Sequence, residues 1–243
     1  MSLSKSELDK TAREYHQTDV LEDKHIEGAC QEYSFQWVFR HIQPEDRVLE
    51  MGYGDGLFSA ELHRRSLRFS IVEGALTLVE AAKRLFPEAG VHHELFEDFQ
   101  PAEPVDVILA THVLEHVDDP VALLGRMKTW LTPRGKIILI VPNKESIHRR
   151  LAVRMGLQPA LDTLGSRDLL VGHQRVYSLD TLKADIRAAG LLPQEQTGFF
   201  LKVLPNSMMK TYSAELIRAL NEISAEMPAE WLANIGIIAS LPE

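Results

Sequence analysis

Hydrophobic positions in the chain gather into short runs that are apolar at almost every residue, separated by longer segments in which apolar and polar positions mix at helical spacing. A short continuous apolar run that ends at glycine, proline or charged residues is typical of a buried strand. Five such runs lie before residue 142, and two more follow near the C-terminus. The predicted strands are residues 47–51, 69–72, 91–96, 105–110, 136–141, 192–199 and 235–241.

Helices are predicted in the segments between these strands. The sequence Asp118-Asp119-Pro120 places an acidic capping residue directly before a proline, which is a favourable first residue of a helix. Pro87 and Gly190 end two other segments, because neither residue readily continues a helix. The predicted helices lie within residues 5–41 and at about residues 57–65, 75–86, 118–131, 179–189 and 213–225.

The alternation of strands and helices indicates the architecture. Strands that are apolar throughout are buried on both faces, as in a parallel sheet with helices on each side. Residues 143–177 interrupt the alternation directly after the fifth strand, so we expect them to project over the carboxyl edge of the sheet as a lid. We therefore predict an N-terminal helical cap segment at residues 1–44 and one α/β domain at residues 45–243 that includes the lid insert.

The loop after the first strand is rich in glycine and reads Glu50-Met-Gly-Tyr-Gly-Asp-Gly56. Glycines permit a tight turn and let a ligand approach the backbone, and the next helix begins at once, so its free N–H groups face the same point. A strand, a glycine turn and a helix form the place where open α/β sheets bind nucleotides. The dinucleotide fingerprint G-x-G-x-x-G fails here, because its third glycine would fall on Leu57 or Ser59.

Other residues at the ends of strands add to the predicted nucleotide site. Glu73 lies 23 residues after Glu50 and ends the second strand, where its carboxylate can accept two hydrogen bonds from a ribose diol. The third strand leads into Phe96 and Glu97, and Glu97 is equally well explained as a solvated loop acid. The fourth strand leads into Thr111. These positions follow strands at the same edge of the predicted sheet as the glycine loop.

Together these motifs resemble a known family. The glycine loop fits an acidic-x-Gly-x-Gly-x-Gly signature at every fixed position. Residues 112–117, which read His-Val-Leu-Glu-His-Val, and residues 133–143 are similar to class I S-adenosylmethionine-dependent methyltransferases of the small-molecule, ubiquinone-biosynthesis-like branch. The resemblance is strong over residues 45–143 and looser through residue 192.

The resemblance implies a fold and a cofactor. The fold would be a Rossmann-like, doubly wound, seven-stranded and mostly parallel sheet of order 3-2-1-4-5-7-6, with an antiparallel seventh strand. The cofactor would be S-adenosyl-L-methionine, with the acid that ends the second strand on its ribose hydroxyls. The residues expected to bind it are Glu50, Met51, Gly52, Gly54, Gly56, Glu73, Gly74, Ala75, Phe96, Glu97 and Thr111.

Histidines supply the candidate general bases. The sulfonium already makes the methyl group electrophilic, so the protein has to align the reactants, exclude water and sometimes remove a proton. His112 follows the fourth strand and is the first candidate, with a loop-organising or cofactor-packing role as the alternative. His116 lies one helical turn further on, and His148 and His173 lie in the lid segment. Each of these three is also explained by a purely structural role.

The lid segment is basic within an acidic chain. The net charge of the chain is −9, whereas residues 144–175 hold six Lys or Arg against three Asp or Glu. This excess indicates an anionic substrate held by Arg149 or Arg175, although a basic face that balances the acidic body explains it equally well. Tyr177 and Tyr15 are further candidates for substrate binding.

Composition excludes several other classes. An acidic chain lacks the basic surface of nucleic-acid-binding proteins. No apolar run approaches the roughly 18 residues of a membrane span, and the N-terminus lacks the apolar stretch of a secretory signal. The single cysteine, Cys30, indicates a reducing, cytoplasmic location. We expect no metal, because no His, Cys or carboxylate cluster has the spacing of metal ligands. The oligomeric state stays open, with a homodimer as one option.

The expected function is methyl transfer from S-adenosylmethionine to oxygen or nitrogen of a small metabolite. Three alternatives stay open at this point. The first is a methyltransferase that acts on protein or RNA, and the second is a non-catalytic protein that binds S-adenosylmethionine. The third is a nicotinamide-dependent dehydrogenase, which the spacing of the glycines disfavours.

Overall fold

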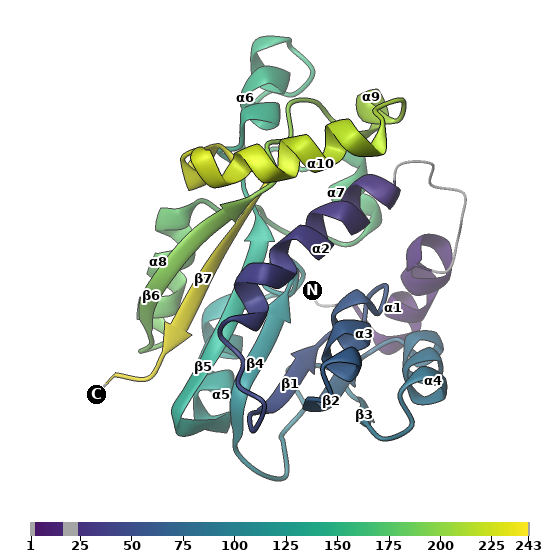
Figure 1. Cartoon of the computed structure of the whole chain (residues 1–243), viewed down its shortest axis with the longest axis vertical. Coiled ribbons are helices and arrows are strands. Elements are labelled where there is room, and N and C mark those ends of the chain that lie inside the picture. The colour runs from purple at the N-terminus through teal and green to yellow at the C-terminus, as the bar shows by residue number, and fades with distance from the viewer. Residues whose placement is uncertain (1–2, 17–23, 243) are drawn as a thin grey trace.

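The computed structural model describes residues 3–16 and 24–242. Its centre is a seven-stranded sheet of order β3-β2-β1-β4-β5-β7-β6, in which β7 runs antiparallel to both of its neighbours (Figure 1). This is the predicted order and the predicted direction of the last strand. The strands are β1 Arg47–Met51, β2 Arg68–Glu73, β3 Gly90–His93, β4 Val105–Thr111, β5 Leu131–Pro142, β6 Leu192–Phe199 and β7 Asn234–Ser240.

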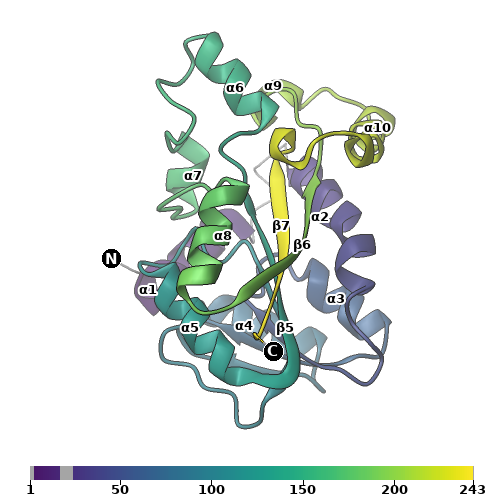
Figure 2. The ribbon, with the colours of Figure 1, turned by 90° about the vertical axis from the view of Figure 1, so that its left-hand side faces the viewer.

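Helices cover both faces of the sheet. Figure 2 shows α5 and α8 on one side and α2, α3 and α10 on the other, and two clusters of buried side chains fill the spaces between. The α-helices are α1 Lys5–Thr11, α2 Lys24–Phe39, α3 Leu57–Arg64, α4 Leu76–Leu85, α5 Pro120–Trp130, α6 Ile147–Arg154, α7 Ser166–Leu170, α8 Leu179–Ala188, α9 Asn206–Met209 and α10 Ala214–Glu222. A π-helical turn at Ala12–His16 and two 3₁₀ turns at Ile223–Glu226 and Ala229–Trp231 complete the description.

The sequence pattern explains the central layer directly. Residues 107–110 of β4 are fully buried because helices cover both faces of the strand, and a strand in this position is apolar throughout. Asp119 accepts a hydrogen bond from the amide of Ala122 at 2.9 Å, and Pro120 is the first residue of α5. The predicted start of this helix is therefore confirmed. Within the described residues, no helix is both long and apolar enough to cross a membrane.

Two predictions about the edges of these elements were wrong. The third strand ends at His93 rather than at residue 96, because Glu94 donates the last backbone hydrogen bond to Glu73 and the chain then turns through residues 95–99. The lid segment, for which no regular element was predicted, contains α6 and α7. Both helices are short, and helices of one to two turns leave little periodicity in a sequence. Part of the N-terminal segment predicted as helical, residues 17–23, lies outside the described residues.

The lid is closed at its base, where its two ends lie side by side. Asn143 and Tyr177 form a parallel bridge, and the amide of Lys144 donates to the carbonyl of Tyr177 at 2.7 Å. The buried side chain of Asn143 donates to the carbonyls of Glu230 and Leu232 at 2.9 and 2.8 Å. It thereby ties the root of the lid to the segment that enters β7.

We expect the substitution Asn143→Ala to destabilise the fold. It leaves buried backbone carbonyls without a donor, which costs about 1–3 kcal/mol of unfolding free energy. Urea unfolding at neutral pH measures this loss. The control is Gln194→Ala, which removes an exposed hydrogen bond to Ser240 and should change stability by no more than about 0.5 kcal/mol. Equal stabilities for the two variants would contradict the role of Asn143.

Candidate active site

A cavity of about 1030 Å³ opens at the carboxyl edge of β1, β2 and β4. This edge is where open α/β sheets bind ligands. The volume lies at the upper end of the usual range of about 300–1,000 Å³ for ligand pockets, so it can hold a cofactor together with a second small molecule. Of the residues predicted for the site, the cavity is lined by Tyr15, Glu50, Met51, Gly52, Gly54, Glu73, Gly74, Ala75, Phe96, Glu97, Thr111, His112, His116, His148, Arg149 and His173.

The glycine loop requires its glycines for conformational reasons. Gly52, Gly54 and Gly56 have φ angles of 80°, 54° and 74°, in the left-handed region that favours glycine. A Cβ at Gly56 would also lie 2.5 Å from the hydroxyl oxygen of Tyr53. Gly56 does not itself line the cavity but precedes α3, and no side chain caps the start of that helix. The first amides of α3 therefore stay available for a ligand.

Glu50 is buried beneath this loop, and its carboxyl group takes part in a short hydrogen bond. The Ser59 hydroxyl donates to its carboxylate at 2.5 Å. Burial, together with the nearby charge of Glu73, raises the pKa of Glu50 to about 8. The side chain is therefore largely protonated at neutral pH in the ligand-free protein.

Glu73 joins the loop to the end of β2. Its two carboxylate oxygens accept hydrogen bonds from the amides of Tyr53 at 2.9 Å and Ala75 at 2.7 Å. Each oxygen keeps a further lone pair, and the side chain lines the cavity. This geometry fits the predicted role of the residue as an acceptor for a ribose diol.

The N-terminal helix α1 packs against the same end of the cavity. Leu8 lies so near Gly74 that a Cβ at that glycine would come within 2.5 Å of it. Asp9 accepts hydrogen bonds from the amide and the hydroxyl of Thr77 at the start of α4, and Lys5 donates to the carbonyl of His93 at 2.7 Å. Helix α1 thus covers the end of the cavity that Glu73 and Gly74 line.

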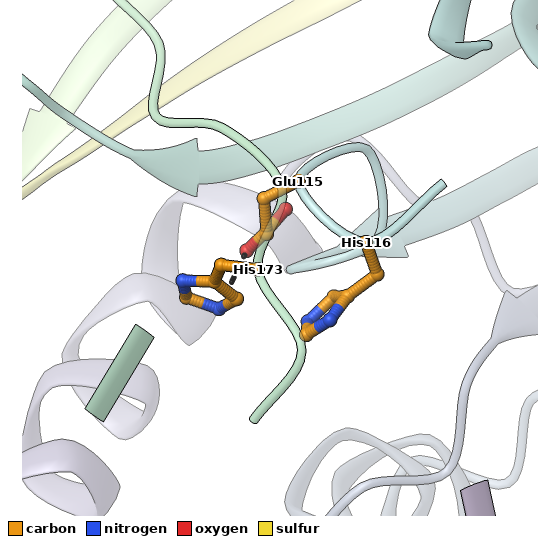
Figure 3. Close-up of side chains that lie close together, drawn as sticks. All are labelled: Glu115, His116 and His173. Atoms are coloured by element: carbon orange, nitrogen blue, oxygen red, sulfur yellow. Dashed lines mark ion pairs between the residues drawn. The ribbon is translucent and has the colours of Figure 1, made fainter. Parts of the chain in front are cut away.

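His112 occupies a strained position at the exit of β4. Its φ angle is 57°, which is unusual for a residue other than glycine and is often found at functional sites. Nδ1 of the ring lies 3.1 Å from Oε1 of Glu115, a carboxylate that is fully buried. His173 also lies near Glu115, with 4.0 Å between its Nε2 and the same oxygen (Figure 3). Its Nδ1 is 2.9 Å from Asp168.

Burial and neighbouring charges shift the pKa values of Glu115, Asp168 and His116. Burial alone would raise the pKa of Glu115, but the hydrogen bond with His112 and the neighbouring imidazoles lower it below its usual value. Burial likewise opposes a low pKa at Asp168, yet the bond with His173 and the charge of Arg149 hold that pKa well below its usual range. Burial lowers the pKa of His116 to about 4, so this ring is neutral at neutral pH.

The same group brings together atoms that could hold a metal ion. In Glu115, His116 and His173, one ligand atom from each residue lies within 4.8 Å of the others (Figure 3). The expectation of no metal came from ligand spacing in the sequence, and it stays a prediction. Sequence spacing does not reveal this group, because Glu115 and His116 are adjacent but His173 reaches them only through the fold of the lid.

Three of the predicted substrate-binding residues serve the lid instead. Arg149 is buried and donates to Asp168 at 2.8 Å and to the carbonyls of Thr163 and Leu161, so its guanidinium is already occupied although it borders the cavity. Arg175 lies outside the cavity lining and donates to the carbonyls of residues 114, 117 and 118.

Tyr177 also lies outside the lining, and its hydroxyl donates to Asp185 at 3.2 Å. Backbone carbonyls and partly buried carboxylates are the partners that satisfy these three side chains. A count of charges in the sequence does not reveal such partners.

The sequence also missed residues that the structure places at the cavity. Asp168 and Lys202 line it, and Glu115 supports His112 from behind. Glu115 was visible only as one letter of the run after β4, and Lys202 follows β6 within a hydrophobic stretch that indicated only core. Tyr15 does line the cavity, and its hydroxyl donates a short hydrogen bond to Glu27.

Comparison with known proteins shows to which family the chain belongs. The family model described as a methyltransferase domain matches residues 23–196, which is most of the chain. The chain belongs to this methyltransferase family. Its cofactor is S-adenosylmethionine, in agreement with the glycine loop and with solved structures of similar fold that carry S-adenosylhomocysteine.

Curated relatives of this methyltransferase are ubiquinone biosynthesis O-methyltransferases. The protein of Xanthomonas euvesicatoria pv. vesicatoria is 32% identical over 113 residues, which is 44% of this chain and 47% of the relative. The protein of Rhodopseudomonas palustris is 26% identical over 164 residues, or 65% of this chain and 63% of the relative. The matched region thus spans about half to two thirds of the length of these relatives.

Solved structures share the fold of this methyltransferase. A methyltransferase from Archaeoglobus fulgidus superposes with a TM-score of 0.57 at 18% identity and covers 86% of this chain and 92% of its own. An O-methyltransferase from neocarzinostatin biosynthesis, in complex with S-adenosylhomocysteine and 1,4-dihydroxy-2-naphthoic acid, has a TM-score of 0.55 at 17% identity. It covers 86% of this chain and 53% of its own.

We expect the substitution Glu50→Gln to stabilise the ligand-free methyltransferase at high pH only. The pKa of Glu50 is about 8 in the folded state and 4.5 as its ordinary value, so ionisation favours unfolding increasingly as the pH rises from about 4.5 to 8. Glutamine cannot ionise and avoids this loss. The melting temperature of the variant should exceed that of the wild type by at least about 2 °C at pH 9, corresponding to about 1 kcal/mol.

At pH 5 the same comparison should give almost no difference. Glu80→Gln is the control, because Glu80 is exposed on α4 and should show no pH-dependent gain. A stabilisation by Glu50→Gln of equal size at both pH values would contradict the raised pKa.

Proposed function

We propose that this methyltransferase transfers the methyl group of S-adenosylmethionine to an oxygen or nitrogen atom of a small metabolite. One observation carries the proposal: the carboxylate of Glu73, the glycine loop and the imidazole of His112 all border one cavity at the carboxyl edge of the sheet. A nucleoside held by Glu73 and the loop would therefore share its cavity with a candidate general base.

Different residues around the cavity can bind different parts of the cofactor. Glu73 offers two acceptor oxygens to the ribose hydroxyls. The uncapped amides at the start of α3 offer donors to the carboxylate of the methionyl group. Phe96, which would lie 3.7 Å from a Cβ at Gly52, offers an apolar surface beside the loop for the adenine. When bound, the cofactor supplies an electrophilic methyl group on a sulfonium.

His112 is the general base of the proposed mechanism. Glu115 is ionised and accepts a hydrogen bond from Nδ1–H, which leaves the lone pair of Nε2 to take the proton of the acceptor hydroxyl or amine. The acceptor atom then forms a bond to the methyl group while the bond from methyl to sulfur breaks, and the sulfonium becomes a neutral thioether. Glu115 acts as a positioning residue, because it fixes the tautomer and the orientation of the ring.

Two further observations support a small acceptor and oxygen as the acceptor atom. The cavity lies between the N-terminal helices, the lid and residues 200–210, so a compact molecule fits between them better than an extended chain. The curated relatives are named for O-methylation. Their aligned region covers only part of their length, so we extend the reaction type to this chain and not the particular substrate.

Binding of S-adenosylhomocysteine tests the cofactor site. Calorimetry should detect saturable binding to the wild type, and Glu73→Ala should weaken it by about 10- to 100-fold, because hydrogen bonds to a charged group are worth about 1.5–3 kcal/mol. Glu80→Ala, at an exposed position on α4, is the matched control. NAD should not bind. Binding of NAD in preference to S-adenosylhomocysteine would refute the proposal.

The general base is tested by turnover. With labelled S-adenosylmethionine and a panel of phenols, acids and amines, His112→Gln should reduce kcat by about 10²- to 10⁴-fold and leave the KM for the cofactor nearly unchanged. Glu115→Gln should reduce kcat less, since the imidazole remains. His63→Gln, at an exposed position on α3, should have no effect. Transfer only to protein or RNA, or no transfer at all, would contradict a small-molecule methyltransferase.

A further inference from the structure

The end of the cavity away from Glu73 is formed by charged residues of the lid, of α2 and of the segment after β6. Arg149 and Asp168 come from the lid, Glu27 comes from α2, and Lys202 comes from the segment after β6. Arg167, at the start of α7, also borders it. The balance of charge among these five side chains indicates what the cavity would bind here.

Four of the five charges neutralise each other in pairs. Arg149 lies 2.8 Å from Asp168, and Arg167 lies 2.7 Å from Glu27. Both carboxylates also accept further hydrogen bonds: Asp168 from His173, and Glu27 from Tyr15 and from Asn206. Both carboxylates are thus engaged by partners other than Lys202.

Of these five charged side chains, Lys202 is the one that is not part of an ion pair among the described residues. In the part of the chain that the structure describes, no hydrogen bond or ion pair engages its ammonium group, although Glu27 lies close enough to attract it. Burial lowers the pKa of Lys202, with Arg167 and Arg149 adding to the effect. At this partly buried position an ammonium without a close counter-charge is poorly compensated, and an anion in the cavity would stabilise it.

His148 provides a second, independent observation at the same end. It borders the cavity, and its Nδ1 atom is buried without a hydrogen-bond partner. Burial, together with the positive charges of Lys202 and Arg149, keeps the pKa of His148 well below its ordinary value, so the ring is neutral. A neutral imidazole can donate one hydrogen bond from Nδ1, which complements an anionic oxygen.

We propose that Lys202 and His148 form a binding site for a carboxylate, and that the methyl acceptor is a small organic acid. This inference rests on the proposed function, because it assigns one end of the same cavity to the acceptor. The methionyl group of the cofactor also carries a carboxylate. In the proposed function the uncapped amides at the start of α3 bind that group, so we assign the carboxylate at Lys202 to the acceptor.

The sequence also predicted an anionic substrate, but it assigned the binding of the anion to other residues. The charge excess of the lid suggested Arg149 and Arg175 as anion ligands, and both are satisfied within the protein. The anion-binding cation lies instead on the segment after β6, outside the region whose charges were counted.

The substitution Lys202→Met tests the site with benzoate and benzamide as probes. The two molecules have nearly the same shape, and only benzoate carries a charge. With the wild type loaded with S-adenosylhomocysteine, millimolar benzoate should raise the melting temperature and benzamide should not. In Lys202→Met, calorimetry should find benzoate affinity reduced by about 10- to 100-fold. Lys144→Met, a lid lysine outside the cavity lining, should bind benzoate like the wild type.

The stability of the ligand-free variants separates a binding role from a structural one. If Lys202 is an unpaired cation awaiting a ligand, Lys202→Met should melt at the same or a higher temperature than the wild type. A lower melting temperature would mark the ammonium as part of the fold. Equal binding of benzoate and benzamide by the wild type, or unchanged benzoate affinity in Lys202→Met, would overturn the proposal.

A second comparison distinguishes the two sources of the carboxylate. S-adenosylhomocysteine carries the amino-acid carboxylate, whereas 5′-methylthioadenosine has the same nucleoside without it. Lys202→Met should bind both as the wild type does. A selective loss of S-adenosylhomocysteine affinity would place the cofactor on Lys202 and overturn the assignment to an acid acceptor. Benzoate is also titrated without cofactor, so a failure of the cofactor site is recognised separately.

Discussion

Two hydrogen bonds to Glu73 hold together the part of the structure on which the function depends. The amide of Tyr53 comes from the glycine loop after β1, and the amide of Ala75 comes from the start of α4. Because one carboxylate receives both, the exits of two neighbouring strands are fixed relative to each other before any ligand arrives. The left-handed glycines allow the loop to make this approach, and the buried Glu50 supports it from below.

The other half of the cavity is organised by charge. Its arginines and acids are paired with each other or with backbone carbonyls, so most of the basic character of the lid stabilises the lid itself. The Lys202 ammonium and the Nδ1 atom of His148 have no such partner among the described residues, which is why we propose them as the carboxylate site. His112 lines the same cavity, in a strained backbone conformation and supported by the buried Glu115. In the proposed assignment, cofactor, base and acceptor share one cavity.

The sequence was sufficient for the fold and for the glycine-loop residues that line the cavity, and insufficient for the contacts of the charged residues in the lid. The central strands are apolar at every position because they are covered on both faces, and the glycine loop has fixed spacing because its backbone requires it. Such local constraints can be read from a single sequence. The partners of Arg149 and Arg175 are contacts made in the folded protein, so counting charges could not show that both guanidinium groups are already engaged.

Other features could not be predicted from the sequence, for the same physical reason. The trio of Glu115, His116 and His173 depends on residues that are distant in the sequence, and the isolated charge of Lys202 is recognised only when every neighbouring charge has been paired. The third strand was predicted too long because an edge strand stops where its one neighbour, β2, stops. These features depend on tertiary packing, which the periodicity of a sequence does not reveal.

A crystal structure of the protein with S-adenosylhomocysteine tests the central claim most directly. The account predicts that both ribose hydroxyls lie within hydrogen-bond distance of the Glu73 carboxylate, that the amino-acid end meets the start of α3, and that the sulfur faces His112. A nucleoside bound elsewhere on the molecule, or bound in this cavity without contact to Glu73, would contradict it.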